Sequence, residues 1–121
     1  MIPLEKIIDY CMNFPGAGQD FPFDQETMTF KVAGKMFALV NVNWWMDGNQ
    51  KMNLKCDPKR ARKLRERYES VTPGYHMNKK HWNTVNINDG ELSESEIFEL
   101  IDHSYDLVVK KLTKKDRDLL A

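Results

Sequence analysis

Residues 28–40 read Met28-Thr29-Phe30-Lys31-Val32-Ala33-Gly34-Lys35-Met36-Phe37-Ala38-Leu39-Val40, two apolar-rich runs separated by Ala33-Gly34. In the first run, apolar and polar residues alternate, and this period of two predicts a half-buried strand over residues 28–32. The second run is apolar at nearly every position up to Val40, which predicts a central strand over residues 35–45 with both faces contacted. Because Ala33-Gly34 permits a tight reversal, we expect the two strands to pair antiparallel.

A third strand is predicted directly after this pair. Asp47-Gly48 is a hairpin signal, and apolar residues then alternate with polar ones from residue 51 to residue 56. Met52, Leu54 and Cys56 would form an apolar face, with Lys51 and Lys55 on the opposite, basic face. Cys56, like Cys11 in the first helix, is therefore expected in the core.

Helices are predicted on both sides of these strands. Residues 4–11 are apolar at helical spacing, and Pro15-Gly16 ends this first helix. Asp57-Pro58 begins a second helix that runs to about Glu69, and its inward stripe is Ala61, Leu64 and Tyr68. Ser93-Glu94-Ser95-Glu96 is a capping box for a last helix whose apolar spacing continues to Leu112, and residues 113–116 are expected to cap a short terminal helix.

The remaining segments complete the predicted topology. Residues 17–23 are interpreted as a loop with Phe21, Pro22 and Phe23 packed against the body, and residues 71–74 as a turn. Residues 75–77 and 82–87 are predicted strand pieces on either side of a loop at 78–80. The order is then α-β-β-β-α-β-β-α in one domain, 1–121. Hairpin-linked strands with segregated helices indicate an α+β fold whose helices cover one face of an antiparallel sheet.

Composition excludes several classes of protein. The 121 residues carry 18 Lys and Arg against 18 Asp and Glu, and 41% are hydrophobic, which is typical of one folded domain. No apolar run approaches the roughly 18 residues of a membrane span, and no secretion signal is visible. Two cysteines provide no disulfide framework, so a cytoplasmic location is expected. We expect a monomer with no membrane partner.

The neutral total conceals a strong segregation of charge. Residues 50–82 carry ten Lys and Arg against three acids, a net of +7, whereas residues 1–49 carry −3 and residues 83–121 carry −4. A local positive field attracts an anionic partner at short range whatever the total charge. Two interpretations stay open: a basic surface for an anionic partner, or a solvated face neutralised by the folded-back acidic ends.

The densest polar cluster lies at residues 73–85, Pro73-Gly74-Tyr75-His76-Met77-Asn78-Lys79-Lys80-His81-Trp82-Asn83-Thr84-Val85. The residues of interest in it are Tyr75, His76, Asn78, His81, Trp82 and Asn83. One interpretation is a self-satisfied turn, in which Asn and His side chains bond local backbone groups. We expect His76, Asn78, His81 and Asn83 to converge around this turn, with at least two of the four side chains bonded to backbone.

The run from Gly74 to Val85 resembles the signature of the MmcQ/YjbR family. The later run Asp102-His103-Ser104-Tyr105-Asp106-Leu107-Val108-Val109 resembles the final-helix motif of that family. Asp9-Tyr10-Cys11 with Pro15-Gly16-Ala17 resembles its opening helix, so the resemblance spans essentially the whole chain. It implies a two-layer α/β sandwich of order α-β(3)-α-β(2)-α. It also implies the "double wing" label, taken from the DNA-binding domain of a phage transcription activator, which is an analogy of fold and not of function.

Nucleic-acid binding without chemistry is the first functional hypothesis, with double-stranded DNA as the candidate partner. The cations expected to contact phosphates are Lys55, Lys59, Arg60, Arg62, Lys63, Arg67, Lys79 and Lys80. Tyr75, Trp82 and one of Trp44 and Trp45 could stack on exposed bases, although tryptophans are more often packed in a core.

Two other classes remain as alternatives. A small regulatory module that binds a protein partner would leave a weak signature in the sequence. An enzyme is not expected, because Asp102, His103 and Ser104 are adjacent on a helix and cannot form a triad. No zinc-type spacing or phosphate-binding glycine loop is present, so no catalytic residue, metal or cofactor is predicted.

Overall fold

The computed structural model describes residues 2–120, which form one six-stranded antiparallel sheet in the order β1-β2-β3-β4-β6-β5. The strands are β1 (Ala17–Asp20), β2 (Thr27–Val32), β3 (Lys35–Asn41), β4 (Lys51–Lys55), β5 (Val71–Pro73) and β6 (Trp82–Asn86). The helices are α1 (Leu4–Met12), α2 (Val42–Met46), α3 (Pro58–Arg67), α4 (Glu94–Lys110) and α5 (Lys114–Asp118). The predicted α+β class and antiparallel sheet are confirmed, with one strand and one short helix, α2, more than expected before α3.

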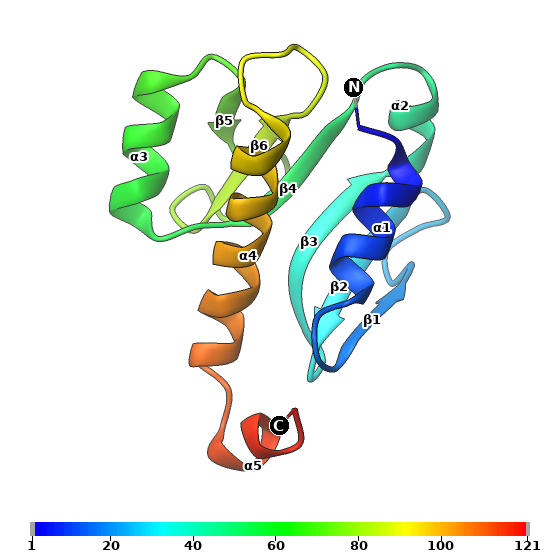
Figure 1. Cartoon of the computed structure of the whole chain (residues 1–121), viewed down its shortest axis with the longest axis vertical. Helices are drawn as coiled ribbons and strands as arrows, with labels where there is room; N and C mark the ends of the chain where they lie inside the picture. Colours follow the sequence, from blue (N-terminus) through cyan, green and yellow to red (C-terminus); the bar gives the residue numbers. More distant parts are fainter. Residues whose placement is uncertain (1, 121) are drawn as a thin grey trace.

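One face of the sheet carries the core. Phe30, Val40 and Leu54 are at most 2% exposed, and strand register places Met28 opposite Val40 and Val40 opposite Met52. The predicted tight turn at Ala33-Gly34 joins β2 to β3. Helix α4 crosses this face, and α1 and α3 lie on either side of it (Figure 1). Both cysteines are buried, as predicted, and Cys11 belongs to the hydrophobic core.

Helix α4 begins where the sequence predicts. The Ser93 hydroxyl accepts from the Glu96 N–H at 3.1 Å, and the Glu96 carboxylate accepts from the Ser93 N–H at 3.1 Å, which completes the capping box. Its inward stripe includes Ile97, Leu100 and Ile101 and continues to Val108. No helix among residues 2–120 combines the length and apolarity needed to cross a membrane.

Strands β3 and β4 pair over only three positions, from Ala38 opposite Leu54 to Val40 opposite Met52. Beyond these pairs the two strands diverge, and α4 fills the opening (Figure 1). The buried Ser104 hydroxyl of α4 donates to the Phe37 carbonyl at 2.5 Å and accepts from the Lys55 N–H at 2.8 Å. One hydroxyl therefore replaces the missing strand-to-strand hydrogen bonds, because buried backbone groups require partners.

Two segments differ from the predicted secondary structure by gaining or losing a strand. Residues 17–20, predicted as a loop, form β1 because they pair with residues 29–32 of β2. This pairing is a tertiary contact that the local sequence pattern does not reveal. The predicted strand over 35–45 ends at Asn41, whose side chain accepts from the Trp44 N–H at 3.0 Å and caps α2. A side-chain cap thus converts an apolar run into a turn of helix.

Two further segments differ in position. Residues 75–77, predicted as a strand, form part of a turn, and the strand in this region is β5 at Val71–Pro73. His76 has a φ of 57°, a left-handed conformation that no strand accommodates. The loop at 21–23 is not packed against the body as predicted, since Phe21 is 42% and Phe23 63% exposed.

Candidate functional site

The loop between β5 and β6, residues 74–81, is closed at its base by backbone hydrogen bonds. The Gly74 N–H donates to the Trp82 carbonyl at 2.9 Å, and the Trp82 N–H donates to the Asn78 carbonyl at 2.9 Å. A Cβ atom at Gly74 would lie 2.7 Å from the Cβ of Trp82, so this position requires glycine. We call residues 74–81 the motif loop.

The expectation that at least two of the four polar side chains around this turn bond backbone groups is wrong. Among the described residues, Asn78 is the one member of the four whose side chain bonds backbone, accepting from the Lys80 N–H at 2.9 Å. Asn83 is buried and bonds an arginine, His76 is exposed, and His81 is half-buried without a side-chain hydrogen bond in residues 2–120. The reason is that an arginine from α3 supplies the donors that the four side chains were expected to supply.

That arginine is Arg65 of α3, which is not among the eight cations expected to contact phosphates. Its Nε donates to the Asn83 side-chain oxygen at 2.6 Å, and its Nη2 donates to the carbonyls of Trp82, at 3.1 Å, and Lys79. A guanidinium presents several donors in a fixed plane and can bond three acceptors at once. Arg65 therefore fastens the motif loop to α3. The signal in the sequence was the position of Arg65, four residues after Ala61 and therefore one turn from a residue of the inward stripe.

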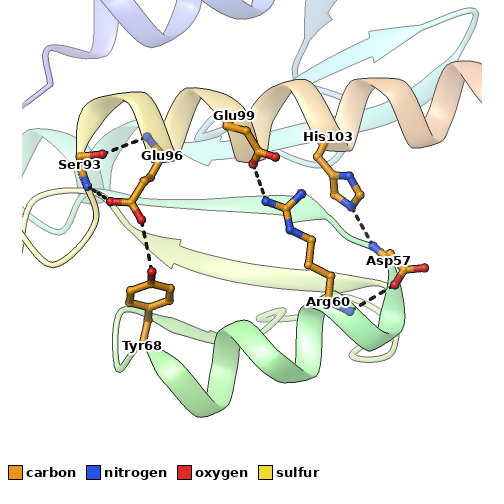
Figure 2. Close-up of polar contacts among 7 residues, drawn as sticks. All are labelled: Asp57, Arg60, Tyr68, Ser93, Glu96, Glu99 and His103. Carbon is orange, nitrogen blue, oxygen red and sulfur yellow. Dashed lines mark hydrogen bonds and ion pairs between the residues drawn. The ribbon is translucent and has the colours of Figure 1, made fainter.

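The eight cations expected to contact phosphates lie in different surroundings. Lys55 lies on β4 with its ammonium 6.0 Å from the centre of the Trp82 ring, and burial, together with Lys111 and Lys35, lowers its pKa. Arg60 turns toward α4 and forms an ion pair with Glu99 at 2.5 Å (Figure 2). Arg60 lines a groove together with Lys63 and Arg67, whereas Lys55 does not line that groove.

Helix α4 lines the opposite side of a groove along α3. Lys63 and Arg67 border this groove, which also contains Glu96 and Glu99. Arg67 contributes to lowering the pKa of Glu96, although the Ser93 hydrogen bonds lower it more. Tyr68 donates to Glu96 at 3.3 Å across the same groove (Figure 2). The acidic C-terminal part of the chain thus neutralises this side of the basic helix.

The other side of α3 faces away from α4 and toward the motif loop. Arg62 is exposed one turn before Arg65, and Lys59 is exposed one further turn toward the start of the helix. Lys79 and Lys80 are exposed on the loop that Arg65 fastens, and the Lys79 ammonium donates to the Gly74 carbonyl at 3.2 Å. We call Lys59, Arg62, Lys79 and Lys80 the basic ridge.

The four aromatic residues predicted as candidates for base stacking differ in how exposed their side chains are. Trp45 and Trp82 are 4% and 7% exposed and belong to the core, whereas Trp44 is 36% and Tyr75 52% exposed. The rings of Trp44 and Tyr75 are neighbours, with centroids 5.6 Å apart. Of the two adjacent tryptophans, Trp44 is therefore the one with a ring available for contact.

Each side chain of the Asp102–Tyr105 run of α4 bonds a part of the molecule outside α4. Asp102 accepts from the Tyr10 hydroxyl of α1 at 2.6 Å, and Tyr105 donates to the Pro15 carbonyl at 2.6 Å. His103 accepts from the Asp57 N–H at 3.2 Å, directly before α3 (Figure 2), and Ser104 bridges β3 and β4. We call these four residues the α4 hub; their role is to connect elements.

The pKa shifts of the titratable groups near these contacts indicate a structural role for these groups. Burial raises the pKa of the Cys11 thiol to about 12 and that of the Cys56 thiol to about 11, so neither thiol forms the reactive thiolate near neutral pH. Burial lowers the pKa of His103, in keeping with a neutral imidazole that accepts a hydrogen bond. Within residues 2–120, no three His, Cys, Asp or Glu side chains are placed to hold a metal ion.

Comparison with known proteins supports the motifs quoted above. The model of the YjbR family matches residues 12–107. "Uncharacterized protein YjbR" of Escherichia coli is 36% identical over 98% of this chain and 97% of its own length. "Uncharacterized protein YbdF" of the same species is 41% identical over 80% of this chain and 76% of its own length.

Solved structures show the same fold. A crystal structure of a Deinococcus radiodurans protein with a DUF419 domain superposes with a TM-score of 0.89 and 38% identity, covering 99% of this chain and 88% of that one. A crystal structure of a Pseudomonas syringae protein has a TM-score of 0.69 at 29% identity, covering 88% of this chain and 98% of that one.

Proposed function

This chain belongs to the YjbR family, and we propose that it binds nucleic acid in the cytoplasm without catalysing a reaction, with the basic ridge contacting backbone phosphates. Duplex DNA is the partner that we propose for this surface. The printed names of the relatives state no substrate or reaction, so the proposal depends on the geometry of this chain.

One observation carries the proposal: Arg65 joins the cations of α3 to those of the motif loop. Its bonds to Asn83, Trp82 and Lys79 hold the loop against the helix. We infer that the exposed side chains of Lys59, Arg62, Lys79 and Lys80 form one surface that these bonds support. Charges placed on a rigid support contact a regularly spaced polyanion with less loss of side-chain entropy than charges on a mobile loop.

The distribution of acids favours this side of α3 over the other. Glu96 and Glu99 of α4 line the groove beside Lys63 and Arg67, whereas the acid on the ridge side is Glu66, four residues after Arg62. Phosphate contacts of this kind set position on the duplex and carry no sequence information. Weak binding with little sequence preference is the expected behaviour.

The salt dependence of binding tests the proposal. With about four phosphate contacts, log affinity plotted against log salt concentration falls with a slope of about −4. The measurement is fluorescence anisotropy of a labelled duplex from low to physiological salt. Reversal of Arg62 and Lys80 to Glu is expected to weaken binding and flatten the slope, whereas Glu66→Gln is expected to strengthen binding.

A matched control separates local contacts from total charge. Lys114 and Lys115 lie in α5, away from the ridge, and their reversal to Glu changes the net charge by the same amount. This control is expected to bind like the wild type. If the wild type fails to bind duplex even at low salt, or if the α5 variant weakens binding as much as the ridge variant, the proposal is wrong and a protein-binding module becomes the better hypothesis.

A further inference from the structure

The face of the sheet opposite the core carries a groove of about 440 Å³. Its floor includes Leu39, Asn53 and Thr84, which register places side by side on β3, β4 and β6. Side chains alternate along a strand, so these residues point away from the core face that α4 covers. We call this cavity the open-face groove; the motif loop contributes Tyr75, His76 and Met77 to its lining.

Hydrogen bonds on the floor of the groove fix the position of Tyr75. The Thr84 hydroxyl accepts from the Tyr75 N–H at 2.9 Å and donates to the Asn53 side-chain oxygen at 2.5 Å. The Asn53 amide in turn donates to the Tyr75 carbonyl at 3.3 Å. Both backbone groups of Tyr75 are thus held while its ring is 52% exposed. This arrangement presents an aromatic ring in a fixed place at the edge of the groove.

Other aromatic groups line the same groove. The Trp44 ring lies 5.6 Å from the Tyr75 ring, the His76 ring lies 4.0 Å from it, and Phe23, which is 63% exposed, contributes from the loop before β2. Exposed aromatic side chains gathered around a cavity mark a surface for binding, because scattered single apolar residues are the normal pattern. The Tyr75 ring is tilted by 48° to the Trp44 ring and by 50° to the His76 ring.

The charges of the groove favour an anionic group on the ligand. Lys51 lines the groove, and no ion pair involves its ammonium among residues 2–120. The one acid in the lining, Asp24, already accepts from the N–H groups of Glu26 and Thr27, at 2.8 and 2.6 Å, and from the Thr27 hydroxyl at 3.1 Å. These hydrogen bonds occupy the oxygens of Asp24 and leave it negatively charged, so Lys51 is the one Lys or Arg that lines the groove and would hold an anionic group.

From these observations, we propose that the open-face groove binds a nucleotide, with the base stacked on the Tyr75 ring and the phosphate at Lys51. The base edge would bond the remaining donor and acceptor positions of Asn53 and Thr84. This inference rests on the proposed function and deepens it, because it adds a site for an unpaired base to a surface for backbone phosphates. The nucleotide comes either free or within a single strand.

Tryptophan fluorescence provides the test. Of the three tryptophans, Trp44 alone is substantially exposed, so a ligand in the groove is expected to quench its emission while Trp45 and Trp82 are unaffected. The probes are adenosine 5′-monophosphate, adenosine, a hexamer of deoxyadenylate and a short duplex. Binding of the monophosphate and the hexamer, but not of the duplex, in the groove is the expected result. Tighter binding of the hexamer than of the monophosphate would identify a single strand as the source, and the reverse a free nucleotide.

Variants assign the roles of the two key side chains. Loss of base stacking in Tyr75→Ala is expected to weaken binding of the monophosphate by about tenfold or more. Lys51→Gln is expected to weaken binding of the monophosphate and to leave binding of adenosine unchanged. Met46→Ala is the matched control, since Met46 lies in α2 near Trp44, is 80% exposed and does not line the groove.

The outcomes separate this inference from the proposed function. The ridge variant, with Arg62 and Lys80 reversed to Glu, is expected to keep full affinity for the monophosphate, because neither residue lines the groove. If wild type and Tyr75→Ala bind the monophosphate equally, or if no quenching occurs at millimolar concentration, the groove is not a nucleotide site. Loss of duplex binding in the ridge variant would leave the proposed function intact in that case.

Discussion

The motif loop and the α4 hub are both polar clusters but have different roles. The motif loop contains two histidines and one asparagine, and the α4 hub contains a histidine, an acid and two hydroxyls. Each side chain of the α4 hub bonds a different part of the molecule. The motif loop is instead held by Arg65 from outside, and Tyr75, Lys79 and Lys80 remain exposed. The α4 hub lies on a packed helix, and its side chains connect other elements. The motif loop is held through its backbone by another residue, so most of its own side chains stay exposed to solvent.

Removal of the Ser104 hydroxyl is expected to have the largest effect on stability. Ser104→Ala leaves the Phe37 carbonyl and the Lys55 N–H without their partner where β3 and β4 diverge. Because an orphaned buried group costs about 1–3 kcal/mol, we expect a loss of about 3 kcal/mol in the free energy of unfolding. Urea denaturation followed by circular dichroism measures it. Ser95→Ala, on the exposed first turn of α4, is the control, and equal losses in both variants would contradict the role of the hub.

Removal of the Arg65 guanidinium is expected to cost somewhat less, about 2 kcal/mol, because its acceptors lie nearer the surface. Arg65→Leu removes the donors to Asn83 and Trp82 while keeping the aliphatic packing. Arg62→Leu, three residues earlier and exposed, serves as the control and is expected to change stability by no more than about 0.5 kcal/mol. A stable Arg65→Leu protein with weakened duplex binding would show that Arg65 contacts the partner directly and does not fasten the loop.

A smaller, pH-dependent effect is expected from His103. Burial is the largest cause that lowers its pKa below the ordinary 6.5, with Arg60 adding to the effect. The unfolded chain therefore binds a proton more readily, so this contribution to stability is complete above about pH 6.5 and is lost as the pH falls toward the folded-state pKa. Melting temperatures at pH 5 and pH 7.5 measure the loss. His103→Gln, whose amide oxygen can accept from the Asp57 N–H, is expected to show a smaller difference between the two pH values; an unchanged difference would exclude His103 as its source.

The smallest effect on stability is expected at Tyr75, an exposed residue of the motif loop, in contrast to the buried and half-buried residues of the α4 hub. Tyr75→Ala removes an exposed ring but keeps the backbone bonds to Thr84 and Asn53. The free energy of unfolding is expected to change by no more than about 0.5 kcal/mol, while binding in the open-face groove weakens. A large destabilisation would show that the ring is a packing residue of the motif loop.

The sequence predicts most of the fold because its local signals agree with one another. The alternation at residues 28–32 and the capping box at Ser93 each depend on short-range physics, and both are present in the structure. Strand β1 has no comparable pattern, since Ala17–Asp20 becomes a strand only by pairing with β2. The end of β3 at Asn41 depends on one side-chain cap inside an apolar run, which periodicity does not detect.

The candidate site was less predictable because it depends on contacts distant in sequence. The cluster at 73–85 was found by composition, but the role of Arg65 requires that α3 packs against the motif loop. The ion pair between Arg60 of α3 and Glu99 of α4 depends on where α4 packs, because Glu99 follows Arg60 by 39 residues. Likewise, the open-face groove brings Phe23, Trp44 and Tyr75 together from three separate segments.

The position of Ser104 also governs the order in which the chain can fold during synthesis. Phe37 and Lys55 find their hydroxyl partner 67 and 49 residues later. At translation rates of about 5–20 residues per second, the sheet waits for several seconds with its apolar face uncovered. Nascent chains that stall within α4 would therefore expose β2, β3 and β4 to chaperones and proteases. Folding of the first half is completed only when the last long helix has left the ribosome.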